Sequence, residues 1–395
     1  MKTIIDKVLF IGDPHFKVNN NSITDVFVEK CLEQVKKYVE EYKEKFLCVI
    51  GGDLLDSHER LHQTPYNKML EFIKSIKQMC NVVILVGNHD YENNQQFLTN
   101  KHWMNALKEW NNVQIVDKVY EVDNLFFVPY VPPGRFIEAL NTFTEKDWKN
   151  ARCIFAHQEI RGCNLGITIS EFGDKWPQDY PLIISGHIHT PHRPQRNVIY
   201  PGSVIQHTFG EMNNETGLYF IDFEKTEEDG KFTKISVEIP RMICVNTSCE
   251  DFEAFMSNLD IKPLQRLKII CTGYEEQFKT VKQSKAYKNL DVNVTVVFKN
   301  INDSFYCSPE YEDCRDCKDC DCTDECQMFQ KNESNMMHTF ENIFSKIVSE
   351  SGDNLLNIFS DIMKDVDFKT MVEKVIESED KELYNDINVN DDVKQ

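Results

Sequence analysis

The sequence predicts an α/β protein, because apolar runs typical of buried strands alternate with amphipathic stretches typical of helices. The first three runs cover residues 7–12, 46–53 and 82–90, and a stretch with apolar side chains at helical spacing follows each of them. Near-continuous apolar runs indicate strands covered on both faces. With 395 residues, the chain is long enough for two or three domains and a sizeable core. We therefore expect strands buried between layers of helices.

The predicted elements follow one another in order along the chain. Helices are predicted over residues 22–46, 65–79 and 95–109, and after residue 113 the strands come closer together. The predicted strands of this second part are VQIV, LFFVPYV, ARCIFAH, PLIISGHIH, NVIYPGS, GLYFIDF and KFTKISVEI. Pro240 marks the expected end of the main domain, which covers residues 1–240.

Composition divides the rest of the chain into three segments. Residues 241–300 read helix, strand, helix, strand, which predicts a small α+β domain. Residues 301–330 are rich in Cys and Asp. Residues 331–395 form an acidic tail, which is expected to be helical because apolar positions recur at helical spacing between residues 338 and 378.

Charge and hydropathy argue against some classes of protein. The formal net charge is −20, and residues 301–395 account for −15 of it, with 24 acidic and nine basic residues. Nucleic-acid partners favour basic surfaces, so this acidity argues against them, but only weakly for the first 300 residues. No apolar run approaches the about 20 residues of a membrane span, and the N-terminus lacks a signal-peptide cleavage site. We therefore expect an intracellular protein, in cytoplasm or nucleus, without a membrane partner.

Polar side chains follow five of the apolar runs, at the point where each predicted strand ends. Ligands of open α/β sheets gather at the carboxyl ends of the strands, so these side chains are expected to meet. In chain order they are Asp13, His15, Asp53, Asp56, Asn88, His89, Asp90, His157, His187 and His189.

The types of these side chains indicate a metal centre. Asp, Asn and His without Cys suit Mn²⁺, Fe or Zn²⁺. Two such ions could share one carboxylate and hold a phosphate oxygen. In an extended segment residues i and i+2 point the same way, so the pairs Asp13–His15 and His187–His189 could each converge on the site. Each motif alone is weak, because a lone DxH is usually a surface loop and Asp53 alone could cap a helix. Five motifs in order, each closing an apolar run, favour the metal centre.

The ordered motifs DxH, GDxxD, GNHD, a lone His and GHxH resemble the signature of the calcineurin-like metallophosphoesterase family. The resemblance spans residues 13–189 and implies a four-layer sandwich, with two mixed β-sheets flanked by helices, as the catalytic domain. It implies that His89 protonates the leaving oxygen and that Asp90 orients His89. It further implies two divalent ions, taken to be Mn²⁺ with Fe and Zn²⁺ as alternatives, one held by Asp13, His15, Asp53 and His189, the other by Asp53, Asn88, His157 and His187.

A narrower resemblance continues beyond these motifs. The stretches YPGSVIQHTFGE and GLYFIDF are similar to the corresponding part of SbcD-type nucleases, the DNA-repair branch of the family. This implies an exonuclease or endonuclease with DNA as its partner, a cap over residues 241–300 and C-terminal helices that dock an SMC-like ATPase. A homodimer is a further expectation. The sequence departs from this branch at Asp56, where a His is frequent, and places His58 two residues later.

Two other functions stay open. A phosphatase or phosphodiesterase acting on small molecules or phosphoproteins would use the same metal ligands, and the net acidity favours it. A non-enzymatic scaffold is the second alternative, but a scaffold needs neither Asn88 nor His89.

Three secondary features complete the predictions. The first is a cluster of six cysteines in the Cys/Asp-rich segment, for which a structural zinc site is one interpretation and an acidic linker and disulfides are the alternatives. The second is a stripe of four lysines at i+3 spacing, which is either a solvated helix face or a contact with DNA phosphates. His192 and His207 are candidates for substrate contact. The cluster comprises Cys307, Cys314, Cys317, Cys320, Cys322 and Cys326, and the stripe comprises Lys279, Lys282, Lys285 and Lys288.

Overall fold

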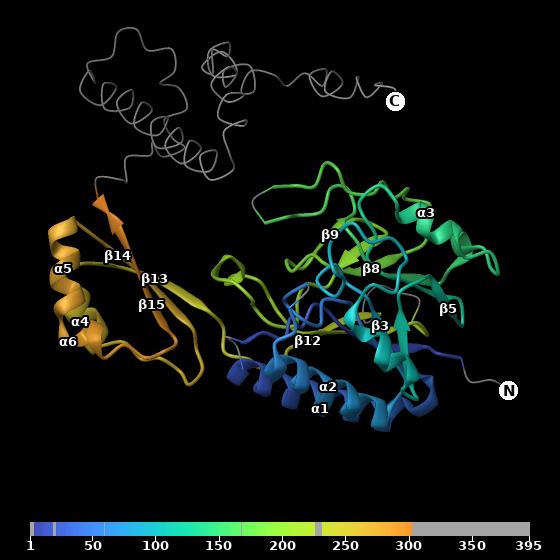
Figure 1. The fold of residues 1–395 in the computed structure, drawn as a ribbon, viewed down its shortest axis with the longest axis horizontal. Helices are drawn as coiled ribbons and strands as arrows, with labels where there is room; N and C mark the ends of the chain where they lie inside the picture. The colour runs from blue at the N-terminus through green and yellow to red at the C-terminus, as the bar shows by residue number, and fades with distance from the viewer. Residues whose placement is uncertain (1–3, 19–20, 59, 167, 226–230, 302–395) are drawn as a thin grey trace, which may run out of the picture. The chain divides into compact units, whose positions relative to one another are not determined.

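The computed structural model describes residues 4–18, 21–58, 60–166, 168–225 and 231–301, and Figure 1 shows their arrangement. The Cys/Asp-rich segment from residue 302 onward, with its predicted zinc site, lies outside the described residues, as does the predicted helical tail. None of the helices within the described ranges is long and apolar enough to cross a membrane.

The first sheet contains the strands that carry the first three motifs. Its order is β12-β11-β1-β2-β3-β4, with β1 parallel to β2 and antiparallel to β11. β2, β3 and β4 continue the parallel arrangement, so the carboxyl ends of β1, β2 and β3 lie at one edge. The strands are β1 (Lys7–Ile11), β2 (Phe46–Ile50), β3 (Val82–Leu85), β4 (Val113–Val116), β11 (Leu218–Asp222) and β12 (Phe232–Ile235).

The second sheet carries the last two motifs. Its order is β5-β6-β7-β8-β10-β9, in which the four inner strands are parallel and the two outer strands are antiparallel to their neighbours. The strands are β5 (Tyr120–Val122), β6 (Leu125–Val128), β7 (Cys153–His157), β8 (Ile183–Gly186), β9 (His192–Gln195) and β10 (Val198–Tyr200).

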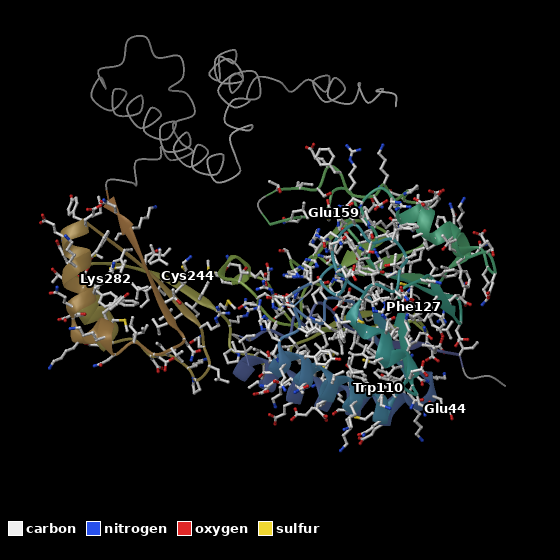
Figure 2. The ribbon with its side chains drawn as sticks, in the orientation of Figure 1. Glu44, Trp110, Phe127, Glu159, Cys244 and Lys282 are labelled. Atoms are coloured by element: carbon white, nitrogen blue, oxygen red, sulfur yellow. The ribbon has the colours of Figure 1, made fainter. Side chains whose placement is uncertain are left out.

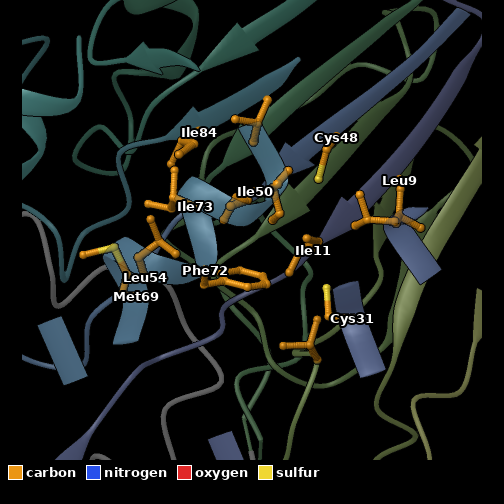
Figure 3. Packing of buried hydrophobic residues seen from close by; sticks show 14 of the residues in the cluster. Leu9, Ile11, Cys31, Cys48, Ile50, Leu54, Met69, Phe72, Ile73 and Ile84 are labelled. Carbon is orange, nitrogen blue, oxygen red and sulfur yellow. The ribbon is translucent and has the colours of Figure 1, made fainter. Parts of the chain in front are cut away.

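The two sheets pack face to face, and helices cover their outer faces. Alternate residues of β1 show this, because Val8 and Phe10 belong to the core between the sheets, whereas Leu9 and Ile11 belong to the core beneath the helices. That second core, drawn in Figure 3, packs the first sheet against α1 (Asn21–Tyr42) and α2 (Gln63–Met79). A third core packs the second sheet against α3 (Phe136–Asn141) and the short 3₁₀ helix η4 (Trp148–Asn150). These four layers confirm the predicted sandwich.

Some predicted elements differ from the structure. The first predicted helix ends at Tyr42, and the 3₁₀ helix η2 (Lys43–Lys45) leads into β2. The predicted third helix is only the 3₁₀ helix η3 (Trp103–Glu109), which begins where the His102 side chain accepts a hydrogen bond from the Met104 amide. Strands β5 and β9 were not predicted. The sequence of β9, HRPQ, is polar and contains a proline, which sheets tolerate at an edge.

Residues 243–300, here called the accessory segment, form a third sheet of three parallel strands. The segment begins with a strand rather than the predicted helix. Buried residues alternate along the central strand, and its buried face packs against the helices. The elements are β13 (Ile243–Ser248), α4 (Phe252–Ser257), β14 (Leu267–Gly273), α5 (Glu275–Gln283), α6 (Lys285–Lys288) and β15 (Val294–Asn300).

The lysine stripe of the accessory segment is exposed, but it does not lie on one continuous helix. Lys279 and Lys282 are on α5, whereas Lys285 and Lys288 are on α6. Ser284 separates the two helices, and its side chain accepts a hydrogen bond from the Tyr287 amide. Figure 2 shows Lys282 among the side chains of these helices. The i+3 periodicity therefore predicted the exposure and missed the break.

A testable stability effect follows from Asp117, whose Oδ2 accepts hydrogen bonds from His102 Nε2 at 3.2 Å and Lys108 Nζ at 2.6 Å. Burial alone would raise the pKa of Asp117, but these two bonds hold it at about 2, below the usual 3.8. Because the pKa of Asp117 is lower in the folded state than in the unfolded state, the charged carboxylate stabilises the fold at pH values above 3.8. This stabilisation is lost as the pH falls from 3.8 toward 2. We expect Asp117→Asn to cost about 1–3 kcal/mol at neutral pH and to flatten this acid dependence.

Urea unfolding across the acid range measures the effect. The matched control is Glu138→Gln, which removes an exposed carboxylate paired with Arg135 three residues away and is expected to change stability little, because solvent screens this pair. An unchanged acid profile in Asp117→Asn would contradict the prediction.

Candidate metal centre

The structure brings the five predicted motifs together at the carboxyl ends of strands from both sheets. The connection between the sheets is direct. His157, at the end of β7, donates a hydrogen bond from Nδ1 to the carbonyl oxygen of Gly51 at 2.7 Å. The amide of His187, just after β8, donates to Asp13 Oδ1 at 2.8 Å. The site therefore lies where the ends of β1 and β2 meet the ends of β7 and β8.

The backbone at the strand ends aims the side chains inward. Four of the candidate ligands have a positive φ, with 46° at Asp13, 41° at His15, 50° at Asp53 and 79° at His187. Non-glycine residues rarely adopt this region, and they cluster at functional sites when they do. The segments after β1 and β8 are thus turns. The pairs Asp13–His15 and His187–His189 therefore do not converge through the extended alternation that the sequence suggested.

Two glycines allow the strand ends to approach one another. A Cβ on Gly87 would lie 2.2 Å from Asp53 Oδ1. A Cβ on Gly186 would lie 2.7 Å from the carbonyl oxygen of Gly51. Any side chain at either position would separate the segments that carry the candidate ligands.

The first cluster of candidate ligands contains Asp13, His15, Asp53 and His189. His15 Nε2 lies 3.2 Å from His189 Nε2 and 3.6 Å from Asp53 Oδ2. The Oδ2 atom of Asp13 is buried and has no hydrogen-bond partner among the described residues. Two imidazole nitrogens that face each other beside unpaired carboxylate oxygen suit a cation, because a cation satisfies all of these atoms. We call this group the first cluster.

The second cluster contains Asp53, Asn88, His157 and His187. Asn88 Oδ1 lies 3.0 Å from His157 Nε2 and 2.9 Å from His187 Nδ1. Asp53 Oδ2 lies 3.3 Å from His157 Nε2. Because Nδ1 of His157 donates to a backbone carbonyl, its Nε2 carries the lone pair in the neutral ring. Asp53 thus contacts both clusters, as a bridging carboxylate would.

The electrostatics of the site show how strongly it favours positive charge. Burial would raise the pKa of Asp53, but the imidazoles of His157, His15 and His89 hold it well below its usual value. Burial would lower the pKa of His157, yet Asp53 and Asp13 raise it to about 9. His187, by contrast, has its pKa lowered to about 3 by burial and by the neighbouring His157. The two carboxylates therefore attract a positive charge, and the donor set fits divalent metal ions.

His89 lies at the rim of the site and is half-buried. Its Nδ1 donates to the carbonyl oxygen of Asp56 at 2.9 Å, and its amide donates to Asp53 Oδ1 at 2.9 Å. A carbonyl oxygen only accepts, so Nδ1 keeps its proton and Nε2 is the nitrogen that can exchange one. His58 stacks on His89, with ring centroids 4.8 Å apart and an interplanar angle of 13°.

Asp90 does not have the expected role of orienting the His89 ring. Its oxygens accept hydrogen bonds from the Gly87 amide at 3.0 Å, the Leu55 amide at 3.5 Å and Trp103 Nε1 at 3.1 Å. Burial and the nearby charge of Asp53 raise the pKa of Asp90 to about 7. Asp90 therefore ties together the turns that follow β2 and β3, and the backbone of Asp56 orients His89 instead.

The remaining candidates lie in different surroundings. Asp56 is exposed, and its Oδ1 lies 3.4 Å from both His15 Nδ1 and Lys17 Nζ. Both ring nitrogens of His192 form hydrogen bonds within the chain, with Nδ1 donating to the Thr190 carbonyl and Nε2 accepting from the Asn164 amide, and its contact with substrate stays a prediction. Its ring also stacks on Tyr200 at 5.0 Å.

Sequence reasoning gave no role to Glu211, whose Oε1 accepts a hydrogen bond from His189 Nδ1 at 3.0 Å. His207 was named only as a candidate for substrate contact, and it is buried against His15 and His189, with ring centroids 4.7 and 5.0 Å away. The only signal for either residue was their position in the stretch 200–211, which resembles other enzymes of the branch.

Removal of the shared carboxylate should empty both clusters. We expect Asp53→Asn to retain less than one divalent ion per chain after exposure to Mn²⁺ and dialysis, against two for the unchanged protein, because Asp53 contacts ligands of both clusters. Elemental analysis measures the content, and the Mn²⁺-induced rise in melting temperature should vanish with it. Asp147→Asn, an exposed carboxylate elsewhere on the same domain, is the control. Retention of two ions by Asp53→Asn would contradict the prediction.

Comparison with known proteins agrees with this geometry. Phosphoesterase 244L of Invertebrate iridescent virus 6 is 52% identical over 285 residues, which cover 71% of this chain and 98% of that protein. Phosphoesterase 078R of Invertebrate iridescent virus 3 is 43% identical over 290 residues, covering 72% of this chain and 81% of that protein. The SbcD component of the nuclease SbcCD from Staphylococcus epidermidis is 25% identical over 228 residues, covering 50% of this chain and 60% of that protein.

A family model described as calcineurin-like phosphoesterase matches residues 6–216, which include every candidate ligand described above. The match covers more than half of the chain. It also confirms the resemblance that the five motifs indicated. The chain belongs to the calcineurin-like phosphoesterase family.

Proposed function

We propose that this protein is a two-metal phosphodiester hydrolase that acts on DNA, as an exonuclease or endonuclease in DNA repair or processing. The observation that carries the proposal is the position of Asp53, whose Oδ2 lies 3.6 Å from a ligand nitrogen of the first cluster and 3.3 Å from one of the second. A carboxylate shared in this way is the arrangement that two-metal hydrolysis requires.

The residues of the chain supply distinct parts of the reaction. Two divalent ions, proposed to be Mn²⁺, would activate a water as nucleophile and neutralise charge on the non-bridging phosphate oxygens. His89 lies beside the shared carboxylate, and its Nδ1 is held by the Asp56 carbonyl. Its Nε2 is therefore free to protonate the leaving sugar oxygen. The stacked ring of His58 restricts the orientations of His89.

Two observations support DNA as the substrate. The Staphylococcus epidermidis relative is named as part of a nuclease, although only half of this chain aligns with it. The accessory segment presents four exposed lysines, which would contact phosphates without reading the base sequence. An SMC-like ATPase that docks on the predicted helices of residues 338–378, and a homodimer, belong to the same proposal.

The second candidate function is a phosphatase or phosphodiesterase acting on small molecules or phosphoproteins. It is favoured by the balance of charge, because the first 300 residues have a net charge of about −5 even without the acidic tail. The two iridescent virus relatives are named as phosphoesterases, with no substrate in the name.

One experiment separates the two candidates. Purified protein is incubated with Mn²⁺ and either end-labelled DNA or an aryl phosphodiester, and the products of each are quantified. We expect degradation of DNA, and we expect Asp53→Asn to lower both rates by at least about a thousandfold, because loss of the bridging ligand removes the metal-activated nucleophile. Cleavage of the aryl ester alone would select the second candidate. Undiminished turnover by Asp53→Asn would overturn both.

The role of the exposed lysines has its own test. Lys279, Lys282, Lys285 and Lys288 are changed together to Gln, and DNA affinity is measured as a function of salt concentration. We expect the slope of log affinity against log salt to become shallower by about 0.9 for each lysine that no longer binds a phosphate. A matched control makes the same charge change at exposed lysines of the catalytic domain, Lys36, Lys37, Lys43 and Lys74. Equal slopes in the two variants would refute a specific role for the accessory lysines.

A further inference from the structure

The last residue of the 3₁₀ helix η5 (Phe209–Glu211) connects His189, a candidate ligand of the first cluster, to the neighbouring His207. Glu211 Oε1 accepts a hydrogen bond from His189 Nδ1 at 3.0 Å, and Thr208 Oγ1 lies 3.3 Å from the same oxygen. Glu211 Oε2 accepts one from the His207 amide at 2.8 Å. Both carboxylate oxygens are therefore engaged by groups that border the site.

The first of these bonds fixes the form of the His189 ring. A carboxylate only accepts hydrogen bonds, so Nδ1 carries the proton, and in the neutral ring Nε2 carries the lone pair. That Nε2 atom lies 3.2 Å from His15 Nε2, at the first cluster. Glu211 thus selects the tautomer of His189 that can hold a metal and keeps the ring turned toward it.

The second bond reaches Asp13 through His207. The His207 ring donates from Nε2 to the carbonyl oxygen of Asp13 at 2.8 Å. His207 is buried, and a ligand atom of its ring lies within 4.8 Å of ligand atoms of His15 and His189. Since Glu211 holds the backbone of His207, it also restrains the segment that carries Asp13.

The turn that carries Glu211 is itself anchored. Gln206 Nε2 donates to the carbonyl oxygens of Glu211 at 3.0 Å and Met212 at 2.9 Å, while the Val204 amide donates to the carbonyl oxygen of Gly12 at 2.9 Å. A carboxylate on an anchored turn holds its partners in one geometry, whereas one on a mobile loop would not.

The second cluster is held differently. His157 Nδ1 donates to the backbone carbonyl of Gly51 at 2.7 Å, and this bond has no carboxylate as its acceptor. His187 is positioned by its amide, which donates to Asp13 Oδ1. Glu211 contacts one candidate ligand, His189 of the first cluster, and none of the second cluster, so its influence on the two clusters should be unequal.

We propose that Glu211 is a positioning residue for the first metal ion, acting directly on His189 and through His207 on the backbone of Asp13. The proposal rests on the two-metal function proposed above. A carboxylate partner also makes an imidazole a stronger ligand than a carbonyl partner does, and such partners typically contribute about 10–100-fold to metal affinity.

The test measures metal binding and needs no substrate. The full chain is freed of metal and titrated with Mn²⁺ alone, using calorimetry and the electron paramagnetic resonance signal of free Mn²⁺ to resolve two affinities. We expect Glu211→Ala to weaken one affinity by about 10–100-fold and to leave the other within about twofold. Glu211→Gln keeps an acceptor oxygen without the charge, so it should fall between the unchanged protein and Glu211→Ala.

The control is Glu215→Gln, which removes the same charge four residues away at an exposed position. It should bind both ions like the unchanged protein. Circular dichroism of the metal-free proteins shows whether each variant is folded. If Glu211→Ala is not folded, the comparison is made with Glu211→Gln. That variant must still weaken one affinity measurably.

Equal weakening of both affinities, or none, would overturn the positioning role. Failure of the proposed two-metal function is recognised by the number of Mn²⁺ ions that the unchanged protein binds. If the unchanged protein binds fewer than two Mn²⁺ ions, the two-metal centre itself is wrong, and the role of Glu211 falls with it. Two ions bound with both affinities unaffected by Glu211→Ala would leave the centre intact and reject the positioning role.

Discussion

The buried negative charge of Asp13 and Asp53 is the constraint on which the rest of the site depends. Both carboxylates are almost fully buried, and they follow adjacent parallel strands. Buried carboxylates cost several kcal/mol each unless cations or hydrogen-bond donors compensate them. The chain supplies part of that compensation through imidazoles from the second sheet. The unpaired oxygen of Asp13 and the facing nitrogens of His15 and His189 leave the remainder to a bound cation.

This arrangement needs the two sheets to be held at a fixed separation with their carboxyl ends aligned. Aromatic side chains between the sheets provide that spacing. The ring of Phe155 on β7 stacks on Phe127 at 5.3 Å within its own sheet and faces Phe10 of the first sheet at 6.1 Å. Interiors are packed like crystals, so such contacts resist sliding of one sheet over the other. Each cluster takes ligands from both sheets. A shift of one sheet against the other by about 1 Å would therefore move the ligands of each cluster apart.

The parts of this site that could be predicted from the sequence are those that local sequence patterns indicate. Most positions of the buried strands are apolar, and the candidate ligands lie at or just after the strand ends, so the fold and the positions of the candidate ligands in the chain could be predicted. What could not be predicted depends on contacts between distant segments. Asp90 sits next to His89 in sequence, but its partners are amides and an indole brought in by folding. The His207 ring forms a hydrogen bond with the backbone carbonyl of Asp13, which is 194 residues away in the sequence, and no local pattern predicts such a contact.

The metal centre determines the class of reaction, whereas the substrate must be selected by what surrounds it. All the candidate ligands lie within the part of the chain matched by the family, so phosphoester chemistry belongs to that part. The iridescent virus 6 relative is matched over 98% of its length by 71% of this chain, so more than a quarter of this chain has no counterpart in it. Features confined to that quarter cannot be needed for chemistry the two proteins share. Within the part matched by the family, the side chains that border the candidate ligands without belonging to them include the exposed Asp56, its neighbour Lys17, and His58, which stacks on His89.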